Sequence, residues 1–102
     1  MGIDVRVVDE SGRELGCLLD PENLTKKLLP DVSDDRFHCL RFIDPYGDTV
    51  FNRYQLPELI AEIEIMLKGA EDEKVRGHGA TIIELARRAL NDVHQYLKFY
   101  GD

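Results

Sequence analysis

The chain has 102 residues, which suffice for one hydrophobic core but not for two. Its 43% hydrophobic and 32% charged residues are typical of a soluble globular protein. The formal net charge of −7 argues against nucleic-acid binding and against docking on an anionic membrane, because both need a concentrated basic surface. The same charge is compatible with a basic partner.

The beginning of the sequence favours a cytoplasmic protein. Its first residues, MGIDVRVV, carry charges where a signal peptide needs an apolar run, and no later stretch approaches membrane-spanning length. Two cysteines, Cys17 and Cys39, make no disulfide framework. We therefore expect both thiols to be reduced and buried.

The first third of the chain predicts a β-hairpin and a short helix. Residues 3–8 alternate between apolar and polar side chains, and residues 14–19 resume as a strand after a turn that contains Gly12. Residues 20–30, DPENLTKKLLP, open with a capping Asp and a Pro suited to the first helical position. The final Pro should end the helix after about two turns.

The stretch from residue 37 to residue 51, FHCLRFIDPYGDTVF, predicts a second hairpin. Residues 37–43 are rich in β-formers and are apolar on both faces, which is typical of an interior strand. Residues 44–47, Asp-Pro-Tyr-Gly, suit a type I turn with a glycine bulge, and residues 48–51 would return as a strand. We expect this hairpin to be buried beneath the helices that follow.

Residues 52–68 predict a first long helix. Asn52 and Gln55 have the spacing of an N-terminal capping box, whereas Pro57 favours a start nearer Leu56, and the sequence leaves both open. Apolar residues then recur at helical spacing to about residue 68. The remaining surface would be acidic through Glu58, Glu62 and Glu64.

Residues 69–79, GAEDEKVRGHG, contain three glycines, five charged residues and a histidine, and they predict an exposed, mobile connection. A continuous apolar face then predicts a last helix from about Thr81 to Tyr100, ended by Gly101.

These elements predict one α+β domain over residues 1–102. It would have two layers, with an antiparallel sheet of about four strands (two hairpins) packed against two C-terminal helices, plus one short helix.

No known catalytic or metal-binding motif occurs in the sequence. The soft metal ligands are scattered and lack the short spacing of a zinc site, so we predict no metal and no cofactor; they are Cys17, Cys39, His38, His78 and His94. No G-x-S-x-G motif is present, and the setting of Cys39 argues against an exposed nucleophile. The sequence therefore favours a protein without enzymatic activity.

A recognition surface is the function class that remains. Arg41 lies in an apolar stretch, so a partner charge should meet its guanidinium, either within the fold or from another molecule. The predicted partner-binding residues follow the same stretch of chain: Arg41, Asp44, Tyr46, Asp48, Asn52, Arg53 and Tyr54. We expect a small protein-binding module, antidote-like or regulatory, that recognises a basic protein through acidic and aromatic side chains.

Two alternatives stay open. One is a small enzyme or ligand-binding domain with a cleft between sheet and helices that uses His38, Arg41 or Tyr54. The other is a homodimer through the C-terminal helices, suggested by the additional apolar residues Ile65 and Met66.

Overall fold

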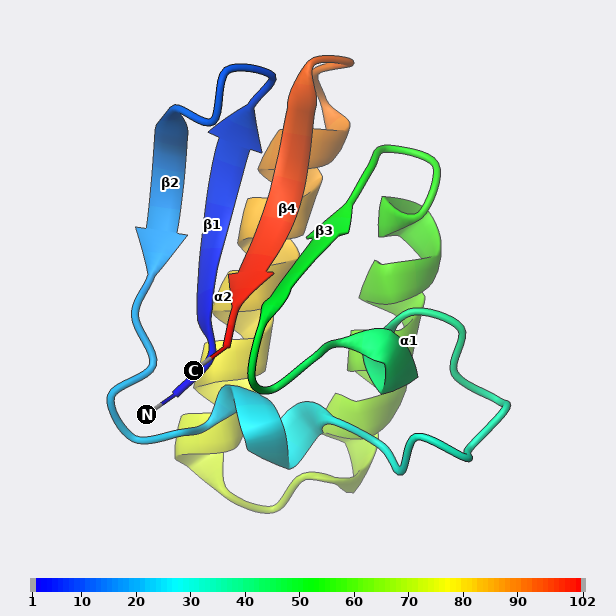
Figure 1. The fold of residues 1–102 in the computed structure, drawn as a ribbon. Helices are drawn as coiled ribbons and strands as arrows, with labels where there is room; N and C mark the ends of the chain where they lie inside the picture. The colour runs from blue at the N-terminus through cyan, green and yellow to red at the C-terminus, as the bar shows by residue number, and fades with distance from the viewer. Residues whose placement is uncertain (1, 102) are drawn as a thin grey trace.

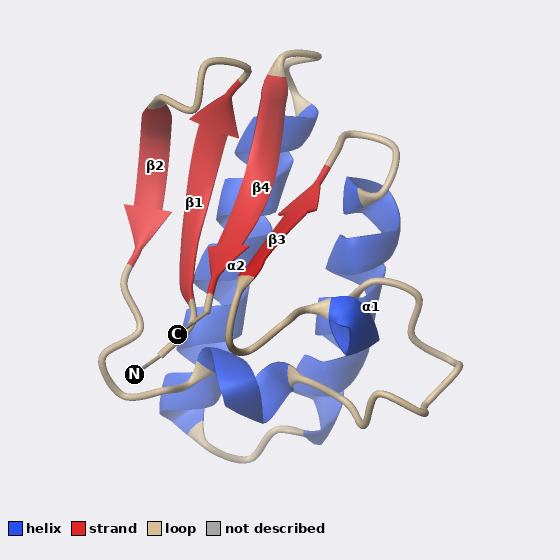
Figure 2. Cartoon of the chain, in the orientation of Figure 1, coloured by secondary structure: helices blue, strands red, loops and turns tan. Residues whose placement is uncertain are grey.

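A computed structural model describes residues 2–101. It consists of a four-stranded antiparallel sheet with two helices packed on one face and two short 3₁₀ turns beside them (Figures 1 and 2). The predicted two-layer α+β fold class is confirmed, but two of its elements come from unexpected parts of the chain.

Strands β1 (Asp4–Asp9) and β2 (Glu14–Leu18) form the predicted opening hairpin, with Gly12 in its turn at a φ of 85°. Strand β4 (Gln95–Tyr100) lies on the other side of β1 and pairs in turn with β3 (Asp48–Phe51). The order is therefore β2-β1-β4-β3, with every neighbouring pair antiparallel.

Helices α1 (Leu56–Gly69) and α2 (Glu73–Leu90) cover one face of this sheet (Figure 1). The strand residues that face them are almost fully buried: Val5, Val7, Phe51, Leu97 and Phe99. Phe51 and Phe99, from neighbouring strands, meet edge to face with ring centres 5.7 Å apart. Each such side chain contributes roughly 1.5–3 kcal/mol by burial, so this layer contact holds the domain together.

The predicted second hairpin is wrong, because residues 37–43 do not form a strand. The segment instead makes a 3₁₀ turn, η2 (Leu40–Phe42), and β3 pairs only with β4 among the described residues. The backbone N–H groups of residues 38–40 donate to the side chain of Glu62 on α1 and not to a neighbouring strand. Apolar content on both faces is typical of an interior strand, but it is equally compatible with a turn whose residues Phe37, Leu40 and Ile43 are buried.

The predicted connection and last helix are also displaced. Asp72 caps α2 by accepting a hydrogen bond from the backbone N–H of Lys74 at 2.8 Å, so only residues 70–72 connect the two helices. Helix α2 ends at Leu90, and residues 95–100 form β4 rather than a last helical turn. In β4, QYLKFY alternates between buried and partly exposed side chains, as a strand does.

The predicted short helix is a 3₁₀ turn, η1 (Thr25–Leu28), that packs against the start of α2. Asp20 takes the capping role that the sequence indicates, since its carboxylate accepts from the backbone N–H groups of Leu24 (2.6 Å) and Thr25 (3.0 Å). In Figure 1, η1 is the cyan short helix and η2 the green one beside α1.

Candidate functional site

A buried carboxylate on α1 fixes the backbone that leads into η2. Glu62 is only 4% exposed, and its oxygens accept hydrogen bonds from the backbone N–H groups of His38 (2.6 Å), Cys39 (3.1 Å) and Leu40 (2.9 Å). Charge-assisted hydrogen bonds of this kind are about twice as strong as neutral ones. The backbone that carries the next two side chains, Arg41 and Phe42, is thus fixed against α1.

A groove lies between η1 and η2, with a volume of about 450 Å³. Most of its lining is apolar: Leu29, Pro30, Val32, Leu40, Phe42, Ile43 and Pro45. Two cations, Lys26 and Arg41, and one carboxylate, Asp44, complete it. Concave apolar surfaces with a few polar groups are the usual form of binding sites.

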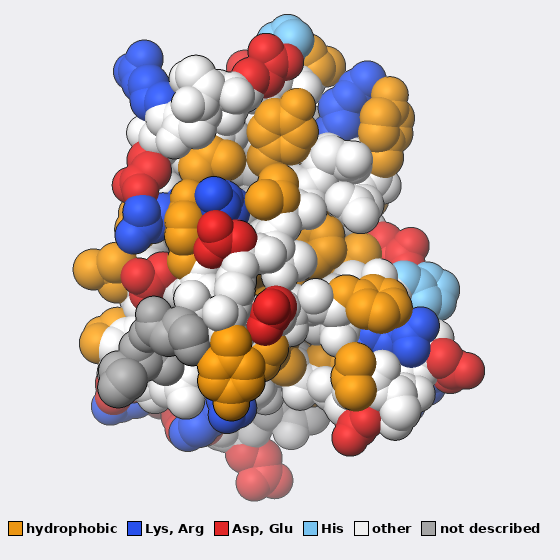
Figure 3. Space-filling view, in the orientation of Figure 1, with side chains coloured by type: hydrophobic (Ala, Val, Ile, Leu, Met, Phe, Trp, Pro, Cys, Tyr) orange, Lys and Arg blue, Asp and Glu red, His pale blue; other side chains and the backbone are white. Residues whose placement is uncertain are grey.

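Large hydrophobic side chains stand exposed around this groove. Val32 is 67% exposed and Phe42 is 57% exposed, and both line the groove, while Tyr46 (76%) follows the lining residue Pro45. In the space-filling view, hydrophobic side chains gather at the lower right, over the part of the chain that carries η2, with a basic side chain among them (Figure 3). Such clusters on a protein surface are typical of contact surfaces.

Arg41 forms no ion pair with a carboxylate within residues 2–101, so the expected partner charge is not paired with it inside the described part of the fold. Its guanidinium carbon lies 4.5 Å from the ring centre of Phe42, and one terminal nitrogen donates to the carbonyl of Val32 at 3.3 Å. Its Nε is shielded from solvent and bonds to no described acceptor. The guanidinium is therefore held in place with hydrogen-bonding capacity to spare.

Of the other predicted site residues, Asp44 lines the groove and Tyr46 stands beside it. Asp44 forms the expected turn, because its side chain accepts from the N–H of Tyr46 at 2.9 Å. Gly47 does not have a positive φ, so no glycine bulge is present. Its carbonyl instead accepts from the N–H of Gly101 at 2.7 Å, which ties this turn to the end of β4.

The remaining predicted residues do not line the groove. Asp48 lies on β3, 3.6 Å from the ammonium of Lys98. Asn52 and Gln55 form the expected reciprocal capping box, in which each side chain accepts from the other's backbone N–H (3.2 Å and 2.9 Å), although α1 itself begins at Leu56.

Arg53 and Tyr54 are exposed beside this capping box. The Arg53 guanidinium stacks on the ring of Tyr54 at 4.6 Å, a geometry that matches the pair formed by Arg41 and Phe42.

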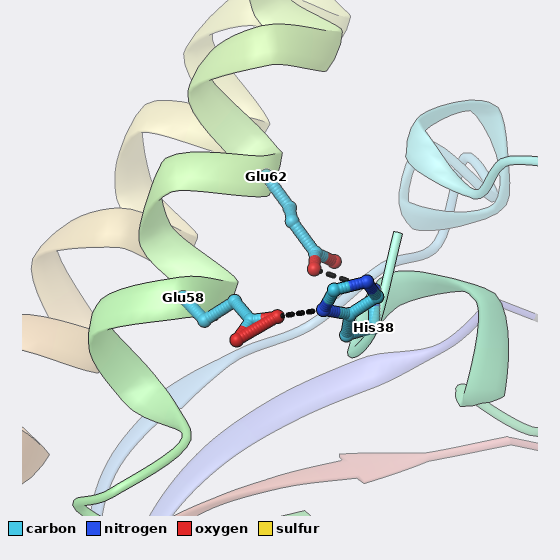
Figure 4. Close-up of side chains that lie close together, drawn as sticks. All are labelled: His38, Glu58 and Glu62. Carbon is cyan, nitrogen blue, oxygen red and sulfur yellow. Dashed lines mark hydrogen bonds and ion pairs between the residues drawn. The ribbon is translucent and has the colours of Figure 1, made fainter. Parts of the chain in front are cut away.

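A second cluster lies on the other side of η2, where His38 faces two glutamates of α1 (Figure 4). The His38 Nδ1 lies 2.6 Å from a carboxylate oxygen of Glu58, and the Glu62 carboxylate lies beside the ring. One donor atom from each residue falls within 4.8 Å of the other two. Imidazole nitrogen with carboxylate oxygen is a donor set that divalent metals use.

Cys39 is not suited to nucleophilic chemistry. Burial and the nearby carboxylates of Glu62 and Glu58 raise the pKa of Cys39 to about 11, so its thiol stays protonated and donates to the carbonyl of Gln55. Cys17 is exposed on β2, contrary to the expectation that both thiols are buried.

A buried polar network ties the N-terminus to α2. The Asp20 carboxylate also accepts from the backbone N–H of Ile3 at 3.0 Å, and the Thr25 hydroxyl donates to the carbonyl of Ile3 at 2.9 Å. Because the hydroxyl has a single hydrogen, the Nε2 of His78, 2.7 Å away, is the donor in its bond to Thr25. Every member is buried and partnered, so this network supports the fold.

Sequence reasoning missed the role of Glu62 and the groove residues on the side of η1, Lys26 and Val32. The helical pattern predicts Glu62 on the acidic surface of the first long helix, yet its neighbours three residues before and four after, Leu59 and Met66, are apolar. A position at the edge of the apolar face is the one local indication that Glu62 could be buried. Lys26 and Val32 gave no signal, because nothing local indicates that η1 lies beside η2.

Comparison of the chain with models of protein families, with curated proteins and with solved structures finds no match. Within residues 2–101, neither α1 nor α2 has the continuous apolar length of a bilayer-spanning helix. Function is therefore inferred from the groove and the side-chain clusters themselves.

Proposed function

We propose that this protein is a binding module without enzymatic activity, and that the groove between η1 and η2 takes an apolar side chain of a partner protein next to a carboxylate. The observation that carries the proposal is the Arg41 guanidinium, which forms no ion pair within the described residues, in a mostly apolar hollow of about 450 Å³. A carboxylate from the partner would form the ion pair that Arg41 lacks within the described chain, where its charge acts on Asp34 only over a longer distance.

The apolar lining supports the first half of this proposal. Val32 and Phe42 expose more than half of their surface, and covering them removes apolar area from water at about 25 cal/mol per Å². A single large aliphatic or aromatic residue fits the scale of the hollow. Anchor residues that fill a pocket commonly dominate the affinity of a protein interface.

The charges of the lining support an acidic flank on the bound segment. The lining has two positive charges, Lys26 and Arg41, and one negative charge, Asp44, although the chain as a whole carries a net charge of −7. The basic partner expected from net charge remains untested, since a protein can be basic overall and still present an acidic contact segment. Local pairing would set specificity, and net charge would mainly affect association rate.

The hydrogen bonds of Glu62 favour a groove that exists before the partner arrives. Residues 38–40 are held by three backbone contacts to α1, so Arg41 and Phe42 do not need to be ordered on binding. Such preorganisation reduces the entropic cost of association. The alternative of a catalytic cleft receives less support, because neither His38 nor Tyr54 lines the groove with Arg41.

A peptide library displayed on phage and selected on the protein tests this proposal. We expect the selected sequences to share a Leu, Ile, Phe or Trp within two positions of an Asp or Glu. Binding of a synthetic consensus peptide should weaken at least about tenfold in Arg41→Ala and in Val32→Glu, which sits at the exposed rim.

Arg53→Ala is the matched control, because Arg53 stacks on its neighbouring aromatic as Arg41 does but lies outside the groove lining. It should leave the affinity unchanged. Selected peptides with Lys or Arg beside the apolar residue would contradict the proposal. Binding that survives both groove variants, or that is lost in Arg53→Ala alone, would place the contact elsewhere.

A further inference from the structure

We infer that His38, Glu58 and Glu62 form a binding site for a divalent first-row transition metal such as Zn²⁺. The site is separate from the groove and does not depend on the binding function proposed above. It lies where α1 meets the residues before η2, and it joins two elements that are far apart in the sequence (Figure 4).

The three donor atoms come from well-defined positions. Glu58 and Glu62 are four residues apart on α1 and therefore project from the same helical face. His38 is placed over them because Glu62 holds its backbone N–H at 2.6 Å. The donors already lie within 4.8 Å of one another, whereas ligands in a tetrahedral zinc site are about 3.4 Å apart.

Small movements of exposed side chains would close this difference. The His38 and Glu58 side chains are 65% and 48% exposed, so both can rotate without disturbing the core. The metal would take the place of the hydrogen now shared between the His38 Nδ1 and the Glu58 carboxylate. Glu62, the buried member, would keep its position.

Glu62 can make room for the ion by giving up one of its longer contacts. Three backbone N–H groups make four contacts to its oxygens, because the Cys39 N–H lies 3.1 Å from one oxygen and 3.2 Å from the other. The ion would take the lone-pair position of one of these two Cys39 contacts, and the other would remain. Within residues 2–101, neither Glu58 nor Glu62 is paired with a lysine or arginine. A buried carboxylate without a cationic partner is a position that a metal ion would stabilise.

The donor chemistry points to the class of metal. One imidazole with two carboxylates suits Zn²⁺, Mn²⁺, Fe²⁺ or Co²⁺, whereas Ca²⁺ needs six to eight oxygen ligands that this site does not offer. Three protein ligands would leave at least one position for water.

Isothermal titration of the untagged protein with ZnCl₂ tests the site, with Co²⁺ absorption as a second readout. We expect one ion per chain and visible Co²⁺ bands of a four- or five-coordinate site. His38→Asn and Glu58→Gln change exposed side chains, and each should weaken binding at least about tenfold.

His94 provides the matched control. Its Nδ1 lies 2.6 Å from the Glu10 carboxylate, the same distance as between His38 and Glu58, but no third ligand of the kind that Glu62 supplies was found beside it within residues 2–101. His94→Asn should therefore leave Zn²⁺ and Co²⁺ binding unchanged. Equal binding by the His38→Asn variant, equal loss in His94→Asn, or no binding of either ion at millimolar concentration would overturn the inference.

Discussion

The carboxylate of Glu62 accepts a hydrogen bond from the backbone N–H of Leu40 at 2.9 Å, and this contact joins the middle of α1 to the start of η2. Leu40 lines the groove, and the next residue, Arg41, supplies its unpaired guanidinium. One buried acid thus couples the helical layer to the proposed binding surface.

Replacing Glu62 by Gln should destabilise the domain by about 2–4 kcal/mol. The amide keeps one acceptor oxygen but turns an NH₂ group toward backbone donors, which leaves buried N–H groups without partners at about 1–3 kcal/mol each. Urea denaturation measures the change in unfolding free energy.

Glu64→Gln is the control for this prediction, since Glu64 is exposed on the same helix and only 3.9 Å from the Arg87 guanidinium. It should change stability by no more than about 0.5 kcal/mol. Equal effects of the two substitutions would show that the backbone contacts of Glu62 contribute nothing.

The stability of the domain should fall as pH decreases from about 7 toward 5. Burial lowers the pKa of His78 below its ordinary 6.5, although the Asp20 carboxylate acts in the opposite direction. The unfolded chain therefore takes up a proton below about pH 6.5 that the folded chain resists, so acid favours unfolding in this window. Urea midpoints at several pH values measure the slope.

His78→Gln should flatten this slope, because Gln does not titrate, whereas exposed His94→Gln should retain it. Protonation of Asp20 should cause a further loss of stability below about pH 3.8, because its pKa is lower in the folded chain than in the unfolded chain. Burial acts to raise the pKa of Asp20, but backbone hydrogen bonds from Ile3, Leu24 and Thr25 and the nearby His78 hold it below its ordinary 3.8. An unchanged slope in the Gln variant of His78 would assign the acid sensitivity to other groups.

Gly77 and Gly79 should respond differently to substitution by Ala. Both lie inside α2, where Ala is favoured over Gly by about 1 kcal/mol. A Cβ at Gly77 meets nothing within 4 Å, so Gly77→Ala should stabilise the domain by about 0.5–1 kcal/mol.

A Cβ at Gly79 would lie 2.6 Å from a methyl carbon of Leu67, which must move to make room. Gly79→Ala should therefore gain less than Gly77→Ala or lose stability, and thermal unfolding of the two variants compares them. A larger gain at Gly79 would mean that the contact between α1 and α2 is loose there.

Local patterns in the sequence predict the β1–β2 hairpin, the capping box before α1 and the α+β class, because each depends on neighbouring residues. The 37–43 segment is misassigned because its β-forming composition favours a strand. Its conformation depends on Glu62, a residue 22 positions away from Leu40. No local pattern contains that information.

The candidate site shows the same division. Arg41 was identified because a charge in an apolar stretch is conspicuous in the sequence itself. Lys26 and Val32 became part of the site only through the packing of η1 beside η2. Likewise, His38 meets Glu58 and Glu62 only because the segment folds against α1 and not into a hairpin.

An NMR titration of ¹⁵N-labelled protein with 3-phenylpropionate, an apolar ring bearing a carboxylate, tests the groove most directly. We expect saturable shifts of backbone amides in residues 29–32 and 40–44, strongly reduced in Arg41→Ala and unchanged in Arg53→Ala. The cation 3-phenylpropylamine should cause much smaller shifts at the same amides. Equal shifts with the amine, or shifts of the acid centred outside the groove, would contradict the proposed binding surface.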